Sequence, residues 1–303
     1  MKQENGRAKW KEVKTKGSKP EPRRAHTGVV AGSRHLVIFG GKSGETKLPL
    51  KDLWLLNLEN WTWHDMSHLR FPGAPRKGHT AVMLGDEMYI FGGRSSNTEY
   101  YDQLFALKFD AHTWMPISWH EISVKEGKRP ALRNHHVASS LSGNRMLIYG
   151  GRGGHDPTYP LLNDVWIFDA ASLKWTEVKP LPDPNLPPMV AHPKPRIESA
   201  SASLSGNSLI IAGGRDFQGR VLNDAWYLEF TKDNEKGAWR SVSPLDCSGE
   251  PIVTPTVTYV SVGFFLGICI LLVAFLAVRY RTRVRQAPYE PIGGGSKRTA
   301  IGV

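Results

Sequence analysis

The feature that most constrains the fold is an apolar run that ends in two glycines and occurs four times. The copies read LVIFGGK, YIFGGR, LIYGGR and IIAGGR, and their glycine pairs begin at Gly40, Gly92, Gly150 and Gly213. These positions lie 52, 58 and 63 residues apart. An unbroken apolar run of this length predicts a strand that is buried on both faces. A unit repeated at this period indicates an architecture in which each unit packs on its neighbours.

Each unit contains the same order of elements. A turn opens it, and the four turns read PRRAHT, PRKGHT, PALRNHH and PRIESA. An alternating strand, the glycine-terminated strand and a polar loop follow, and the loop leads to Asp52, Asp102, Asp164 or Asp224. A third strand comes next, and a tryptophan strand closes the unit at WTWHDM, TWMPIS, KWTEVK and AWRSVS. Four short strands per unit predict four-stranded blades around an axis, which is a β-propeller.

These motifs resemble the kelch repeat over roughly residues 7–243. The resemblance implies an all-β, kelch-type β-propeller with four complete four-stranded blades that binds protein partners. One segment is left over, because AKWKEVKTKG at 8–17 reads like LKWTEVKPLP at 173–182. This stray outer strand predicts an incomplete ring, in which the chain begins partway through a propeller. A ring that closes in some other way is the alternative.

A second feature is the uncharged apolar run from Val257 to Val278. As a helix, it would span about 33 Å, which matches a hydrocarbon core of about 30 Å. It therefore predicts a single transmembrane helix after the propeller. We expect a stray outer strand and linker at 1–19, four kelch repeats at 20–244, a juxtamembrane linker at 245–256, the transmembrane helix at 257–278 and a basic, disordered tail at 279–303.

The charges flanking this run predict its orientation. Four arginines follow it within seven residues, whereas the segment before it carries Asp246 and Glu250. The positive-inside rule then places the tail in the cytoplasm and the propeller outside the cell or in a lumen. No export signal is visible, so a tail-anchored protein with a cytosolic propeller is the alternative. Asn60 begins a glycosylation triplet, and Gly263 with Gly267 would allow helix dimerisation.

Cations recur at one rim of the predicted blades. The first and second strands of a blade run antiparallel, so the opening turn and the residue after the glycine pair lie at the same rim. The predicted partner-binding residues are Arg24, Lys42, Arg76, Arg94, Arg133, Arg152, His155, Tyr159, Arg196 and Arg215. Such a cationic mouth would bind an acidic or phosphorylated protein partner. The alternative is structural, with each aspartate holding a nearby arginine.

Composition argues against other functional classes. The formal net charge is +11, but six of the basic residues lie in the tail, and the repeats lack the basic stripe with interleaved aromatics expected of a nucleic-acid-binding protein. Both cysteines, Cys247 and Cys269, lie outside the repeats. Kelch-fold oxidases use copper and a cysteine-crosslinked tyrosine, so a copper- or other metal-dependent enzyme is a disfavoured alternative. We expect no catalytic residues, metal or cofactor. A fragment of a larger kelch-containing membrane receptor is a third interpretation.

Overall fold

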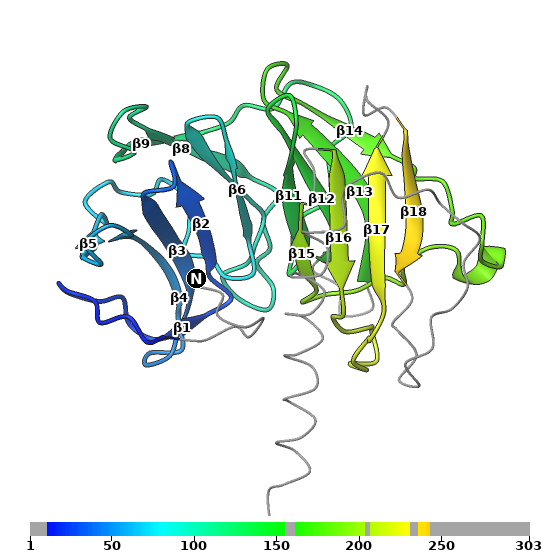
Figure 1. Cartoon of the computed structure of the whole chain (residues 1–303), viewed down its shortest axis with the longest axis horizontal. Helices are drawn as coiled ribbons and strands as arrows, with labels where there is room; N and C mark the ends of the chain where they lie inside the picture. The colour runs from blue at the N-terminus through cyan, green and yellow to red at the C-terminus, as the bar shows by residue number, and fades with distance from the viewer. Residues whose placement is uncertain (1–10, 155–160, 204–206, 231–235, 243–303) are drawn as a thin grey trace, which may run out of the picture. The chain divides into compact units, whose positions relative to one another are not determined.

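A computed structural model describes residues 11–154, 161–203, 207–230 and 236–242. The chain divides into two units, Met1–Pro244 and Leu245–Val303, and every described residue belongs to the first. Four antiparallel sheets follow one another along the chain, as Figure 1 shows. The described residues contain one short 3-10 helix, η1 (Pro188–Val190). The all-β prediction with four blades is confirmed.

Each sheet is one blade, and the strands follow sequence order from its inner to its outer edge. Blade 1 contains β1 (Arg23–Arg24), β2 (Thr27–Ala31), β3 (His35–Ser43), β4 (Pro49–Asn57) and β5 (Trp63–Asp65). Blade 2 contains β6 (Thr80–Leu84), β7 (Glu87–Phe91), β8 (Leu104–Phe109) and β9 (Pro116–Glu121). Blade 3 contains β10 (Arg133–Asn134), β11 (Val137–Leu141), β12 (Arg145–Gly153), β13 (Leu161–Asp169) and β14 (Lys174–Val178). Blade 4 contains β15 (Ala200–Ala202), β16 (Ser208–Ala212), β17 (Ala225–Phe230) and β18 (Gly237–Val242).

The apolar runs are buried because their two faces pack against different blades. In blade 2, Ile90 points into a cluster shared with blade 1, and its neighbour Phe91 points into a cluster shared with blade 3. A third cluster joins Tyr149 of blade 3 to Ile211 of blade 4. Successive side chains of a strand alternate between its faces, so a strand that contacts two neighbours must be apolar throughout. Among the described residues, no such cluster joins blade 4 to blade 1.

The glycine pair is required by the close approach of the next blade. Gly92 has a φ of 69°, and a Cβ on it would lie 2.6 Å from the carbonyl oxygen of Arg133 in blade 3. The second glycine, Gly93, donates its N–H to that same carbonyl at 2.8 Å. Equivalent bonds run from Gly41 to Arg76 and from Gly151 to Arg196. Glycine is therefore needed both for its backbone conformation and for the space beside it.

The structure corrects the prediction for blade 2. The predicted tryptophan strand began around Trp114, but Trp114 lies in a turn with a φ of 56°. The outer strand is β9, and its tryptophan is Trp119, which pairs with Leu107. A register shift in β9 adds one residue to this strand relative to β8. The longer turn and the bulge shift the outer strand toward the C-terminus, so the position of Trp114 did not predict its register.

The predicted membrane segment and residues 8–10 of the stray strand lie outside the described residues. Within the described ranges, no helix has both the length and the apolar character needed to cross a bilayer. The run Val257–Val278, the tail, and the glycines at 263 and 267 are outside these ranges. Of the stray segment, Lys16 is described, and it forms a parallel bridge with Thr62 beside β5.

Candidate functional site

Three blades contain an ion pair between a buried arginine side chain and a half-buried aspartate at the rim where the glycine pairs lie. Two guanidinium nitrogens donate to two carboxylate oxygens at 2.6–2.7 Å in Arg23–Asp52, Arg133–Asp164 and Arg196–Asp224. The tryptophan two residues after each aspartate donates its indole N–H to the same carboxylate at 2.7 Å. Burial raises the pKa of each carboxyl, but the bonds from arginine and tryptophan outweigh it and hold the pKa below its usual value. These arginines therefore have a structural role.

The pair in blade 1 corrects the predicted register by one residue. Arg23, not Arg24, occupies the position of Arg133 and Arg196, and Arg24 is exposed beside Lys42. By sequence, either Arg23 or Arg24 could align with the buried arginines of the other blades. Their side chains point to opposite faces of the strand, and only the pairing with β3 decides which one meets Asp52.

Blade 2 has the buried arginine without its carboxylate. Arg76 is fully buried and donates to the carbonyl of Gly92 at 3.0 Å, as its counterparts do to their own glycines. Gln103 replaces the aspartate and accepts one bond at 3.3 Å, while the predicted Asp102 is exposed. The rings of Phe71, Tyr101 and Phe105 surround the guanidinium at 4.5–5.1 Å from its Cζ. Burial lowers the pKa of Arg76 to about 10.

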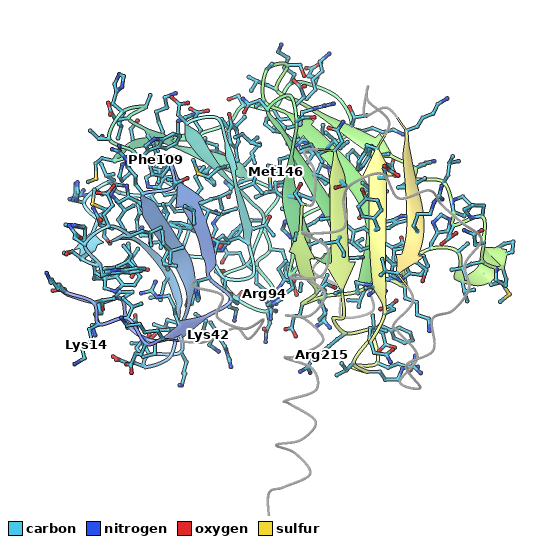
Figure 2. The ribbon with its side chains drawn as sticks, in the orientation of Figure 1. Lys14, Lys42, Arg94, Phe109, Met146 and Arg215 are labelled. Carbon is cyan, nitrogen blue, oxygen red and sulfur yellow. The ribbon has the colours of Figure 1, made fainter. Side chains whose placement is uncertain are left out.

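Four of the remaining cations stand in like-charged pairs across neighbouring strands, in blades 1 and 2. Arg24 lies opposite Lys42 in blade 1, and Lys77 lies opposite Arg94 in blade 2. The same register holds Asn134 opposite Arg152 in blade 3 and Ile197 opposite Arg215 in blade 4. Like charges placed directly across a strand pair are destabilising, so these pairs do not help the fold. Figure 2 shows Lys42, Arg94 and Arg215 at the same end of the sheets.

These two pairs of cations face a shared pocket of about 420 Å³. Its lining consists of Arg24, Ala25, Lys42, Lys77, Arg94, His135 and Glu198. Two arginines and two lysines therefore share the lining with a single carboxylate, that of Glu198, which lies 3.5 Å from Arg215 outside the lining. Within the described part of the chain, no carboxylate lies within ion-pair distance of Arg24, Lys42 or Lys77. The pocket has the charge to bind an anionic group.

The pKa values of two lining residues are lowered by burial and by the neighbouring positive charges. Burial lowers the pKa of the Lys77 ammonium, and the nearby charges of Arg94, Lys42 and Arg24 lower it further. Burial also lowers the pKa of His135, and Glu198 opposes this shift. An anion bound among these groups would stabilise their charged forms.

Backbone bonds between blades hold the pocket lining in place. Gly78 donates its N–H to the carbonyl of Ala25 at 2.9 Å, His135 donates to Gly78 at 2.7 Å, and Glu198 donates to His135 at 3.2 Å. All four residues have positive φ values, between 54° and 66°. This chain of bonds passes from blade 1 to blade 4, so the cations come from blades whose positions are fixed relative to one another.

The predicted site residues thus separate into groups. Arg24, Lys42 and Arg94 line the pocket, whereas Arg76, Arg133 and Arg196 are buried beneath the surface. Arg152 and Arg215 are exposed on blades 3 and 4, and His155 and Tyr159 lie outside the described residues. Sequence reasoning left Lys77, His135 and Glu198 out of the site. Aligning the four opening turns on their buried arginine would have found Lys77, because it follows Arg76 as Arg24 follows Arg23.

The histidines of the first strands serve packing between blades. His79 Nε2 lies 3.1 Å from Thr27 Oγ1 in blade 1, and His136 Nε2 lies 2.7 Å from Thr80 Oγ1 in blade 2. The structural equivalent of His79 is therefore His136. Among the described residues, no group of three or more His, Cys, Asp or Glu side chains could hold a metal ion.

Comparison with known proteins gives the same architecture. The model of the KLHDC2/KLHL20/DRC7 Kelch-repeats domain matches residues 4–192 and 76–261. Host cell factor 2 of Homo sapiens is 31% identical over 194 residues, which is 57% of this chain and 23% of that protein. Putative adagio-like protein 2 of rice (Oryza sativa subsp. japonica) is 30% identical over 190 residues, which is 62% of this chain and 27% of that protein. This chain thus spans about a quarter of the length of these relatives.

Proposed function

Because this chain belongs to the kelch-repeat family, we propose that it is a membrane-tethered interaction platform that binds a protein partner through the loop face of its propeller. Kelch-repeat propellers bind protein partners, and the face that carries the pocket is where the variable loops of the blades meet. The proposed role is binding without catalysis.

One observation carries this proposal, namely the two cross-strand pairs of cations that face the pocket. Arg24 with Lys42 and Lys77 with Arg94 repel each other in the free protein. A carboxylate or phosphate between them would remove that repulsion and accept charge-assisted hydrogen bonds. The proposed ligand is therefore an acidic or phosphorylated segment of the partner.

Peptide binding to charge-reversed variants tests this proposal. The probes are an array of peptides in phosphorylated, Asp/Glu-containing and neutral versions, applied to the full chain in detergent. We expect the wild type to retain anionic peptides and the Lys42→Glu/Arg94→Glu variant to lose them, with binding by the wild type weakening as salt is raised. Lys174→Glu, which reverses an exposed charge on β14, is the matched control. Equal retention of neutral and anionic peptides, or unchanged binding by the folded double variant, would refute the pocket as the ligand site.

The membrane tether is proposed from the apolar run Val257–Val278, which is separated from the end of β18 by 14 residues of sequence. We expect the full chain to stay with membranes in alkaline carbonate. Leu266→Lys and Leu271→Lys together should release it, because charges near the centre of a span are costly. Release of the wild-type chain under these conditions would count against a spanning helix. Pairing of two such helices through Gly263 and Gly267 is part of the same proposal.

The proposed orientation places the propeller outside the cell or in a lumen, with the basic tail in the cytoplasm. Asn60 is exposed in the turn before β5, and its side-chain oxygen accepts the N–H of Thr62 at 3.1 Å. In this orientation Asn60 is accessible to glycosylation, so Asn60→Gln should remove a glycosidase-sensitive mobility shift. A propeller digested from the cytosolic side of intact vesicles would instead establish the tail-anchored orientation.

A further inference from the structure

The outer strand of a blade has one edge with unpaired backbone groups, and blade 1 covers that edge with its own chain. Lys16 donates its N–H to the carbonyl of Trp61 at 2.8 Å and accepts the N–H of Trp63 at 2.9 Å. The segment around Lys16 runs parallel to β5. Exposed strand edges are templates for pairing, so this segment completes the sheet.

Blade 4 covers its outer edge in the same way, and blade 3 has one backbone bond of this kind. Leu181 donates its N–H to the carbonyl of Gly237 at 2.8 Å and accepts the N–H of Trp239 at 2.9 Å, also in parallel orientation. In blade 3, Lys125 donates its N–H to the carbonyl of Leu173 at 2.9 Å. In each case the covering segment comes from the chain that leads into the blade. Blades 1 and 4 thus show how an outer edge binds an extended segment through two backbone bonds.

Blade 2 differs because the chain that leads into it turns inward. Phe71 is buried between blades 1 and 2, with its ring 4.8 Å from Phe39 and 4.7 Å from Phe105. It also packs at 5.0 Å against Trp119 of β9. The residues that could have crossed the edge of β9 are used instead to fill the space beneath it. Among the described residues, no segment covers the edge of β9.

The backbone groups on this edge can be assigned from the ladder. Ile122 donates its N–H to the carbonyl of Leu104 on β8, so alternate residues of β9 turn their N–H groups the other way. Trp119 pairs with Leu107 just as Trp239 pairs with Leu228. The N–H of Trp119 therefore points away from β8. Ile117 is the extra residue of the bulge, so the residue that pairs as Gly237 does is Pro116. Met115 accepts the N–H of Asp110 on the β8 side, so the carbonyl of Pro116 points away from β8. Among the described residues, no backbone group bonds the N–H of Trp119 or the carbonyl of Pro116 across this edge.

The side chains beside the edge are also open. Ile117 is 51% exposed and Met115 is 37% exposed, which makes them two of the exposed large apolar residues of blade 2. An incoming strand would cover them while it paired with the backbone. Main-chain bonds of this kind supply affinity, and side-chain contacts supply selectivity.

We propose that the outer edge of β9 binds an extended segment of a partner protein, which adds to blade 2 as a strand parallel to β9. The segment donates an N–H to the carbonyl of Pro116, accepts the N–H of Trp119 and places an apolar side chain against Ile117. This edge is distinct from the cationic pocket and depends on neither the charge of the ligand nor the membrane tether.

The first experiment measures amide hydrogen exchange in the full chain in detergent. The amides of Trp63 and Trp239 are bonded across their edges and should exchange slowly, whereas the equivalent amide of Trp119 should exchange about tenfold faster or more. Equal protection of all three amides would show that the edge is already covered and would overturn the proposal.

The second experiment supplies a segment that this protein already uses for the purpose. The probe is a synthetic peptide of residues 176–183, TEVKPLPD, which contains the Leu181 that pairs with β18. At millimolar concentration it should slow exchange at Trp119, and the same peptide N-methylated at the position of Leu181 should not. Ile117→Lys should abolish the protection, because a lysine on a strand edge opposes pairing. Thr176→Lys, at an exposed position of β14, is the matched control and should bind the peptide normally.

Absence of protection at Trp119 with saturating peptide, or equal protection by the N-methylated peptide, would overturn the proposal. Protection that appears without peptide and rises with protein concentration would assign the edge to pairing between two copies of this chain, which also overturns it. Since the readout is one backbone amide of blade 2, these outcomes are independent of charge reversal in the pocket.

Discussion

Arg76 and Arg133 occupy the same position in neighbouring blades and are equally buried, yet only Arg133 faces a carboxylate. Two residues of the repeat are replaced together in blade 2. Gln103 stands in place of the aspartate, and Phe105 stands in place of the tryptophan that would bond its carboxylate. Aromatic rings take over part of the stabilisation through cation–π contacts. A buried charge without a counter-ion is costly, so Arg76 is a weak point of the fold.

We expect Gln103→Asp to raise the free energy of unfolding by about 1–2 kcal/mol, since it restores a bidentate partner to Arg76. Urea unfolding of the full chain, followed by tryptophan fluorescence, measures the change. Asp102→Asn is the control and should leave stability unchanged, because Asp102 is exposed. A destabilised Gln103→Asp protein would show that the aromatic cage has replaced the carboxylate fully.

A second prediction at this scale concerns pH. Burial, together with the charge of Arg76, lowers the pKa of His79 to about 3, and burial lowers the pKa of His136 well below its usual value. The unfolded chain binds these protons near pH 6.5, so it holds more protons than the folded chain between that pH and about 3. The free energy of unfolding should therefore fall as the pH drops below about 6.5. Denaturant titrations from pH 8 to pH 4 test this. The free energy of unfolding should change less with pH in His79→Gln than in the wild type. An equal pH dependence in the two proteins would show that His79 does not cause it.

At the scale of elements, the glycine pairs of blades 1, 2 and 3 each join two blades. The second N–H of each pair bonds the backbone of the next blade, while its first carbonyl accepts the guanidinium of its own. The strand that ends in these glycines is thus coupled to both the buried arginine of its blade and that of the following blade. This explains why a run of strong strand formers ends at a residue with low strand propensity.

Gly92→Ala should destabilise the protein by about 3 kcal/mol, because positive φ and a backbone clash act together. A Cβ at Gly92 would lie 2.6 Å from a main-chain oxygen that cannot move without shifting blade 3. Gly219→Ala is the matched control, with a φ of 77° and open space around it, and should cost only about 1 kcal/mol. Thermal or urea unfolding distinguishes the two, and equal costs would mean that the close approach contributes nothing.

At the scale of the whole molecule, the blades differ in how many neighbours they pack against. Blades 2 and 3 share apolar clusters on both faces, whereas blades 1 and 4 share a described cluster on one. In repeat proteins, the free energy of unfolding is approximately the sum of the stabilities of the repeats and of the interfaces between neighbouring repeats. Protection against local opening should therefore be greatest in the two middle blades.

Amide exchange in the full chain should show this gradient. The amide of Leu147 in β12 should exchange at least about tenfold more slowly than that of Ile210 in β16, which occupies the same place in blade 4. Leu147 is fully buried and Ile210 is only half-buried. Equal rates at the two positions would indicate that the second face of blade 4 is covered as well.

The sequence was sufficient for the class of fold and the order of strands. Periodicity, turn residues and the apolar runs before Gly40, Gly92, Gly150 and Gly213 act locally, so they can be read along one chain. The same information predicted that cations gather at one rim, and Lys42 and Arg94 do line the pocket. It failed at single-residue register, where Arg24 was taken for Arg23 and Asp102 for the position of Gln103.

What only the tertiary structure decided is which of these charges are buried and which face the pocket. The burial of Arg23 and the exposure of Arg24 depend on the strand that each one meets, and that strand lies far away in sequence. Lys77 and His135 reach the same pocket because backbone bonds between blades bring their turns together. The open edge of β9 likewise depends on where Phe71 packs. Strand composition is a local property, whereas register and contact between blades arise from pairing across the chain, which no local pattern encodes.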